Sequence, residues 1–371
     1  MQHPVYIIAD NIITPLGNTT EENFLQISNG ITAIVKHTHP QIGEYYAAKL
    51  NEDPIIFTDA VSYSRIEQLF IASIQQTFKQ LSISPESEDV LFVLSSTKGN
   101  IDQLSNQHFD KNRLRLGVTA QIITDYFKQP NTPVVISNAC ISGLQAIQYA
   151  AHVLNQKKYK YVVVSGADLV SDFVLSGFHS FQALSPFPCR PFDKERAGVS
   201  LGEGCGTLIL SAEANQKDDI KIIAAASSND ANHLSGPSRT GEGLANAIQQ
   251  AMEQALVKSE DIDLILSHGT ATIYNDEMES LAFQTCGVIQ APVFSVKGNI
   301  GHTLGAAGII ETILLAKSMK DQQLIPSIGY KEQGTTVALN VITKKEKQNT
   351  SFTLKTASGF GGGNTALILK K

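Results

Sequence analysis

The sequence predicts an α/β protein built from two similar halves, and two patterns support this prediction. Apolar runs rich in Val and Ile alternate with helix-like segments along most of the 371 residues, which indicates a parallel or mixed sheet covered by helices on both faces. Residues 134–154 and 293–316 also share one pattern, in which a β-run leads through a turn into a helix of small residues. Such helices can approach other backbones closely, so we expect two buried central helices that face one another.

The first predicted half spans residues 1–213. It opens with a strand from residue 5 that ends at a Pro-Gly turn, and the helix that follows from residue 19 carries acids in its first turn, as helix N-termini favour. Residues 64–81 form a helix with its apolar side chains at helical spacing. The remaining predicted elements are a strand at 89–96, a helix at 119–127, a strand at 133–137, a helix at 141–155 and a strand at 159–168.

The second predicted half spans residues 214–371 and follows the polar connector EANQKDD. Its predicted elements are a strand at 220–226, a helix at 243–257, strands at 262–269 and 292–298, a helix at 303–319 and a strand at 352–369.

Composition excludes several classes of function. A net charge of -6, with 17% charged residues, provides no electrostatic footprint for nucleic acid or an anionic membrane. The longest apolar stretches are broken well short of a bilayer span, so we expect no transmembrane helix. The four cysteines are widely spaced with no CxxC pair, which favours a reducing cytoplasm and predicts no zinc or other metal site.

Cys140 lies at the turn between a predicted strand and a predicted helix. A free cysteine is often a buried, inert packing residue. At a helix N-terminus, however, free N–H groups and the positive end of the helix dipole stabilise a thiolate. The position therefore favours a nucleophile, and partner residues must decide between the two interpretations.

Candidate partners lie in the second half. His268 ends an apolar run, and His302 follows Lys297 by five residues in a glycine-rich turn. Open α/β sheets bind ligands outside the carboxyl ends of their strands, so these three groups and Cys140 can converge there. A single such histidine is more often structural, and a Cys/His pair alone equally suits a protease or an acyltransferase. The second histidine with its nearby lysine favours the acyltransferase.

Five motifs in order then resemble the β-ketoacyl-acyl-carrier-protein synthases, the decarboxylating condensing enzymes of thiolase-like fold. They are NACISG, RPFDKERAGVSLGEGCG, HGTATIYNDEMES, KGNIGHTLGAAG and SGFGGGN. The resemblance covers nearly the whole chain. It implies a duplicated five-layer αβαβα architecture and the decarboxylative Claisen condensation of an acyl thioester with malonyl-carrier protein.

The resemblance also implies a role for each matching residue. Cys140 becomes the acylated nucleophile, and His268 and His302 promote decarboxylation. Lys297 organises charge, and the backbone N–H groups of Cys140 and Phe360 form an oxyanion hole, in which each donor is worth roughly 3 kcal/mol. The other implied roles are arm binding for Thr270 and Thr272, a buried carboxylate near the lysine for Glu279 and a structural carboxylate for Asp276.

The implied substrates are carried on the phosphopantetheine of acyl carrier protein, with no bound cofactor. Of the basic residues that dock the carrier in housekeeping relatives, the segment SRIEQLF retains one, Arg65. Substitute contacts are sought in KNRLR and NQKKYK, although each also suits a solvated basic loop. We expect a homodimer through the strand before Cys140, with a heterodimer with a related subunit left open.

Other classes of function are disfavoured by particular residues. SGFGGGN carries no second catalytic cysteine, as a thiolase requires, and His302 stands where another type of carrier-protein synthase has asparagine. A non-elongating chain-length-factor subunit is the alternative, although such subunits typically lose the nucleophile that Cys140 represents. The departures from housekeeping enzymes point toward polyketide or aryl-polyene pathways beside fatty acid synthesis.

Overall fold

The computed structural model describes residues 3–51, 63–230 and 236–371. Five strands of the first half and five of the second join in one mixed sheet. The first five are β1 (Val5–Ile13), β4 (Val90–Ser95), β5 (Val134–Ile136), β6 (Tyr161–Asp168) and β8 (Gly204–Ser211). The second five are β9 (Lys221–Asn229), β10 (Leu264–Leu266), β11 (Val293–Phe294), β14 (Phe352–Ser358) and β15 (Gly363–Lys370).

The two half-sheets repeat one topology. Their combined order is β11-β10-β14-β15-β9-β1-β8-β6-β4-β5. From each outer edge inward, two parallel pairings are followed by two antiparallel ones, and the halves meet where β1 pairs with β9. The predicted duplication is therefore present in the strand order. The division into domains at residue 213 stays a prediction.

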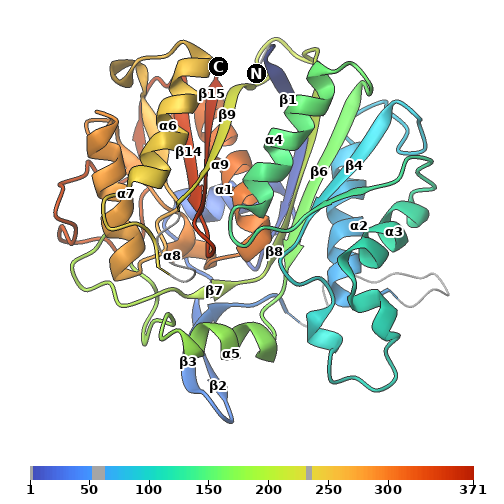
Figure 1. The fold of residues 1–371 in the computed structure, drawn as a ribbon, viewed down its shortest axis with the longest axis horizontal. Helices are drawn as coiled ribbons and strands as arrows, with labels where there is room; N and C mark the ends of the chain where they lie inside the picture. The colour runs from blue at the N-terminus through green and yellow to red at the C-terminus, as the bar shows by residue number, and fades with distance from the viewer. Residues whose placement is uncertain (1–2, 52–62, 231–235) are drawn as a thin grey trace.

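Helices form three further layers around the half-sheets (Figure 1). Two central helices, α4 (Ser142–Asn155) and α9 (Ala307–Asp321), share one apolar core with strands of both halves. On the outer face of the first half-sheet lie α2 (Arg65–Phe78) and α3 (Leu116–Tyr126), and on that of the second lie α6 (Glu242–Ala255) and α7 (Ile273–Thr285). The thiolase-like five-layer prediction is confirmed.

The central helices touch backbone to backbone because glycine lies at their crossing. A side-chain carbon on Gly143 would lie 2.9 Å from Ile309 N, and one on Gly308 would lie 2.6 Å from Leu144 N. Neither distance is sterically allowed for a β-carbon, so any larger residue would force α4 and α9 apart. The small residues of the sequence thus set the distance between α4 and α9, and with it the positions of the residues that precede each helix.

Several elements differ from the sequence prediction. The predicted strand at 352–369 is wrong, because it is a hairpin of β14 and β15 that turns at Gly361 and Gly362, both with positive φ. The predicted helix at 303–319 becomes regular only at Ala307. The elements that the prediction missed are α5 (Asp172–Ser180), α7, α8 (Lys297–Ile300), β8, the hairpin β2 (Val35–His39) and β3 (Gly43–Ala48), and the short strands β7 (Leu201–Gly202), β12 (Gln323–Leu324) and β13 (Glu346–Lys347).

The first helix, α1 (Thr20–Ser28), begins with a capping box at Thr19 and Glu22, as the acids in its first turn suggested. Within the described residues, none of the helices combines the length and apolar character needed to cross a bilayer.

Candidate active site

Cys140 lies between the end of β5 and the start of α4, in a turn that Ala139 makes possible by adopting a φ of 44°. A left-handed conformation costs a non-glycine residue about 1 kcal/mol or more, so the surrounding structure must hold this turn. The side chain is 8% exposed and lines a cavity of about 260 Å³. Cys140 is therefore buried yet reachable from the cavity.

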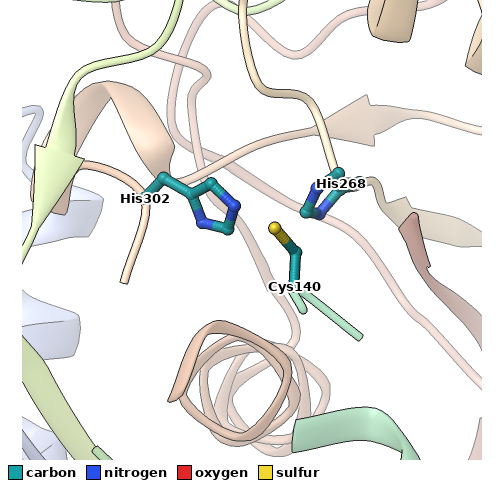
Figure 2. Close-up of side chains that lie close together, drawn as sticks. All are labelled: Cys140, His268 and His302. Carbon is teal, nitrogen blue, oxygen red and sulfur yellow. The ribbon is translucent and has the colours of Figure 1, made fainter. Parts of the chain in front are cut away.

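Two histidines from the second half of the chain meet this sulfur. His268 follows β10 and His302 follows α8, and each is 2% exposed. The Cys140 sulfur and a ring nitrogen of each histidine all lie within 4.8 Å of one another. Figure 2 shows the three side chains pointing toward one another. The imidazole rings are nearly perpendicular, with centroids 5.2 Å apart. The structure thus brings together three of the four groups that were expected to converge.

The neighbours of each imidazole determine its tautomer. The backbone N–H of Leu304 donates to Nδ1 of His302 at 3.3 Å, and the Lys297 ammonium lies 3.4 Å from Nδ1 of His268. Because both neighbours are donors, each Nδ1 accepts and each Nε2 carries the proton. Among the described residues, Nε2 of His302 is buried with no hydrogen-bond partner. Both rings can therefore donate a hydrogen bond to a bound substrate.

Burial, followed by the positive charge of Lys297, holds the pKa of His268 and of His302 well below the usual 6.5. Both rings are therefore neutral at pH 7. Burial raises the pKa of the Cys140 thiol to about 11, although Lys297 acts in the opposite direction. At pH 7 Cys140 is therefore a neutral thiol, because burial disfavours the thiolate.

Lys297 is fully buried and is paired with a carboxylate that the sequence analysis did not single out. Its ammonium lies 2.6 Å from Oε1 of Glu311 on α9 and also donates to the carbonyl of His268. A buried cation requires such a partner. Its signal in the sequence was a single acid within the otherwise apolar run IIETILLA.

Glu279 is buried and binds the backbone of His268. Its oxygens accept the N–H groups of His268 and Gly269 at 2.7 Å and 2.6 Å. Asp276 accepts the N–H of Phe192 at 2.7 Å, and burial raises its pKa to about 7. Asp276 also accepts the N–H of Ala271 at 3.2 Å, so Glu279 and Asp276 both shape the loop that carries His268.

The two threonines expected to bind the substrate arm lie on the cavity wall. Thr270 and Thr272 have hydroxyls 2.9 Å apart, and Thr272 also caps α7 by accepting the N–H of Asn275. The Thr270 hydroxyl also accepts the N–H of Thr272 at 3.4 Å, so both hydroxyls are partly committed to the backbone at the start of α7.

The glycine loop brings Phe360 to the same cavity. Gly359 packs against Cys140, since a side-chain carbon there would lie 3.2 Å from Cys140 N. In the described residues, neither the Cys140 N–H nor the Phe360 N–H donates to another protein group. The Phe360 ring, 37% exposed, packs on Phe178 and Phe181 with centroids 5.8 Å and 5.4 Å away. The loop thus brings one N–H without a partner among the described residues, and an aromatic ring, to the cavity that Cys140 lines.

A metal ion does not suit this cluster, although its three ligand atoms are close enough to hold one. A histidine that binds a metal usually donates its other ring N–H to an acceptor. Here the other nitrogen of each ring faces a donor, so that Nε2 carries a proton and lacks the lone pair that a metal requires. The arrangement suits hydrogen-bond donation to a substrate oxygen.

We predict that iodoacetamide labels Cys140 well before the other three cysteines. Cys189, Cys205 and Cys286 are buried, and of the four only Cys140 lines the cavity. Because alkylation requires the thiolate and the Cys140 pKa is about 11, labelling should accelerate by up to tenfold per pH unit between pH 7 and 10. Peptide mapping at several pH values measures this, and faster labelling of another cysteine would contradict the assignment.

Sequence profiles identify the family to which this architecture belongs. The profile for the β-ketoacyl synthase N-terminal domain matches residues 2–216, and the profile for the C-terminal domain matches residues 220–331. A 3-oxoacyl-[acyl-carrier-protein] synthase 2 from Staphylococcus aureus is 28% identical over 407 aligned residues, covering 99% of this chain and 98% of that protein. The Vibrio cholerae protein of the same name is 33% identical over 64% of this chain and 62% of its own length.

Solved structures support the same placement. A ketosynthase in complex with its chain length factor, from Xenorhabdus doucetiae, superposes with a TM-score of 0.92 and 25% identity, over 99% of this chain and 98% of that one. A β-ketoacyl synthase from Burkholderia phymatum shares the fold at a TM-score of 0.88 and 24% identity, over 100% of this chain and 99% of that one. With both domain profiles matched in order, the chain belongs to the β-ketoacyl synthase family, whose members are condensing acyltransferases.

Proposed function

We propose that this chain is an active elongating ketosynthase. It joins an acyl group held on Cys140 to malonyl-carrier protein, in fatty acid or polyketide-type biosynthesis. The observation that supports this proposal most strongly is the pair of neutral imidazoles beside the sulfur, each with its Nε2 proton available. A protease with a Cys/His pair requires one such ring as a base, whereas two donors suit a developing enolate oxygen.

The first step transfers the acyl group to the enzyme. The Cys140 sulfur attacks the thioester carbonyl, the bond to the phosphopantetheine sulfur breaks, and the leaving thiol takes the proton that Cys140 gives up. The backbone N–H groups of Cys140 and Phe360 stabilise the oxyanion of the tetrahedral intermediate. Because burial raises the pKa of the thiol to about 11, Cys140 enters this step mainly as the neutral thiol.

The second step forms the carbon–carbon bond. His268 and His302 donate to the malonyl thioester oxygen while carbon dioxide departs and its electron pair enters the enolate. The enolate carbon attacks the acyl carbonyl on Cys140, and the released thiolate takes a proton from solvent. The product is a 3-oxoacyl thioester on the carrier protein.

The substrate arm is proposed to bind along Thr270 and Thr272, and no other cofactor is required. The proposed partner is therefore an acyl carrier protein, as the names of the curated relatives suggest. We also propose a cytoplasmic location, since all four cysteines are unpaired thiols.

Four of the basic residues considered for carrier docking are engaged within the protein. Arg65 lies 3.1 Å from Glu203, and Arg113 pairs with the buried Glu67. Lys111 donates to three backbone carbonyls, and Lys160 lies 2.7 Å from Asp89. The docking of an acidic carrier is therefore assigned first to the exposed Arg115, Lys157 and Lys158.

The second candidate function is that of a chain-length-factor-like subunit. It is favoured by one finding, the resemblance to a structure of a ketosynthase with its chain length factor. Loss of acyl loading on Cys140 in the presence of active carrier substrates would favour this alternative.

Dimerisation is predicted from the edge of the sheet. β5 pairs only with β4 in the described residues, and its three residues Val134–Ile136 are half-buried and apolar. An uncovered apolar edge is an aggregation hazard, so we expect a second subunit to cover it. Light scattering should give twice the chain mass of 40.1 kDa. A stable, active monomer at micromolar concentration would contradict this, and poor solubility cured by a related subunit would identify a heterodimer.

A further inference from the structure

A second fully buried lysine lies behind the active site, and neither step above uses it. Lys355 lies on β14, paired in register with Leu266 of β10 just before His268. Its ammonium lies 2.8 Å from Oε2 of Glu311, as an ion pair without hydrogen-bond geometry. A buried charge is costly, so it calls for a compensating role.

Each of the two lysines contacts one oxygen of Glu311 and one backbone carbonyl next to or at His268. Lys297 binds Oε1 of Glu311 and the carbonyl of His268. Lys355 faces Oε2 of the same carboxylate, lies 3.5 Å from the carbonyl of Ser267, and donates to the carbonyl of Thr356. Two ammonium groups therefore hold two consecutive carbonyls of the segment that ends in His268.

The backbone N–H groups at His268 are bound by a different residue, Glu279. Glu279 accepts the N–H groups of His268 and Gly269, and the hydroxyl of Thr356 donates to Glu279 at 3.0 Å. Thr356 thus joins Lys355 to Glu279 through its carbonyl and its hydroxyl. The backbone of His268 is clamped on both sides, and Lys355 takes part in the clamp.

We propose that Lys355 is a positioning residue of the condensation reaction: together with Lys297 and Glu311 it holds the His268 backbone and adds positive charge behind both imidazoles. This inference rests on the proposed function. Lys297 and Lys355 share the Glu311 carboxylate, and Glu279 adds a second carboxylate on the other side of Thr356.

The positive charge of Lys355 affects the pKa of both imidazoles in a known direction. Lys355, with Lys297, lowers the pKa of His268 and of His302, so its removal raises the pKa of both. Activity is lost where the rings become protonated, so the acidic limb of the rate profile moves to higher pH. The charged and titratable groups around the two rings are Lys297 from α8, Glu311 from α9, Lys355 from β14, Glu279 and Asp276 from α7, Asp168 from β6, and Cys140.

The test is carbon dioxide release from malonyl-carrier protein by Lys355→Met between pH 5 and 9. We expect kcat to fall roughly 3- to 10-fold at pH 7, with KM unchanged because Lys355 does not line the cavity. We also expect the acidic limb to move up by roughly half to one pH unit. A lysine outside the site provides the control: Lys320→Met removes a cation 3.9 Å from Asp219 and should leave both quantities unchanged.

The double variant Lys355→Met with Glu311→Gln separates charge from packing. It removes one positive and one negative charge, so the net charge of the wild-type cluster is restored and the acidic limb should return toward the wild-type position. If Lys355→Met does not fold, Lys355→Gln carries the test, because its amide can still donate to the Thr356 carbonyl while the positive charge is removed. Iodoacetamide labelling of Cys140 and the melting temperature report whether each variant keeps its site.

A wild-type acidic limb in folded Lys355→Met would overturn the role of Lys355 while leaving the proposed function intact, and so would a limb displaced equally in the double variant. If the wild-type enzyme itself released no carbon dioxide while Cys140 labelled normally, the proposed function would fail, and the role of Lys355 with it.

Discussion

Replacing Cys140 by alanine is expected to abolish acyl loading and condensation while decarboxylation of malonyl-carrier protein persists. The sulfur forms the bond to the acyl group, so its loss should lower condensation on the order of 10⁴-fold or more. The donors for the enolate oxygen lie on His268 and His302, and this substitution leaves both in place. Intact-mass analysis measures loading, and trapped carbon dioxide measures decarboxylation.

The matched control for that experiment is Cys286→Ala. Cys286 is also buried, but it lies at the end of α7 and is outside the cavity. It should load acyl groups at the wild-type rate. Acyl loading of Cys140→Ala at a comparable rate would remove Cys140 from the mechanism.

Replacing either histidine is expected to have the opposite effect: decarboxylation should fall while acyl loading is largely kept. His268→Ala and His302→Ala should each lower decarboxylation by about 10²- to 10³-fold, or roughly 3–4 kcal/mol, because each loses one donor to the enolate oxygen. Acyl loading, which relies on backbone donors, should fall far less. Carbon dioxide release at saturating malonyl-carrier protein measures the effect.

The pH profile of the wild-type enzyme tests the protonation states behind this prediction. Both imidazoles have a pKa well below 6.5, so decarboxylation should stay level from pH 8 to below 6.5 and fall only at lower pH.

The control for the histidine substitutions is His152→Ala, which replaces an exposed histidine of α4. Release of carbon dioxide by His302→Ala at the wild-type rate would show that this ring is not a donor.

Most of the architecture was predictable because each half repeats one simple pattern. The Val- and Ile-rich runs correspond to buried strands, and the small-residue helices correspond to α4 and α9 at the centre. The C-terminal hairpin was not predicted, because apolar residues continue on both sides of Gly361 and Gly362 and only their positive φ reverses the chain. β8 was hidden by its glycines, which pack against α9 and so contribute no side chains to a periodic pattern.

The catalytic triplet was predictable from local sequence, whereas its supporting charges were not. Cys140, His268 and His302 each lie at the end of a strand or short helix, within a motif that the sequence displays. Glu311 and Lys355 lie inside α9 and β14, where nothing local shows that they share one ion-pair cluster. The raised pKa of Cys140 was not visible in the sequence for the same reason, since it comes from burial by distant segments.

The central claim is that Cys140 carries the acyl group that is then joined to malonyl-carrier protein. The most direct measurement is intact-mass analysis of the enzyme after incubation with acyl-carrier proteins of different chains, followed by addition of malonyl-carrier protein. The account predicts a mass gain of one acyl group, mapped to Cys140, which disappears on addition of malonyl-carrier protein as carbon dioxide and a carrier-bound 3-oxoacyl product two carbons longer appear. No mass gain with any acyl chain, or an acyl group on another residue, would contradict it.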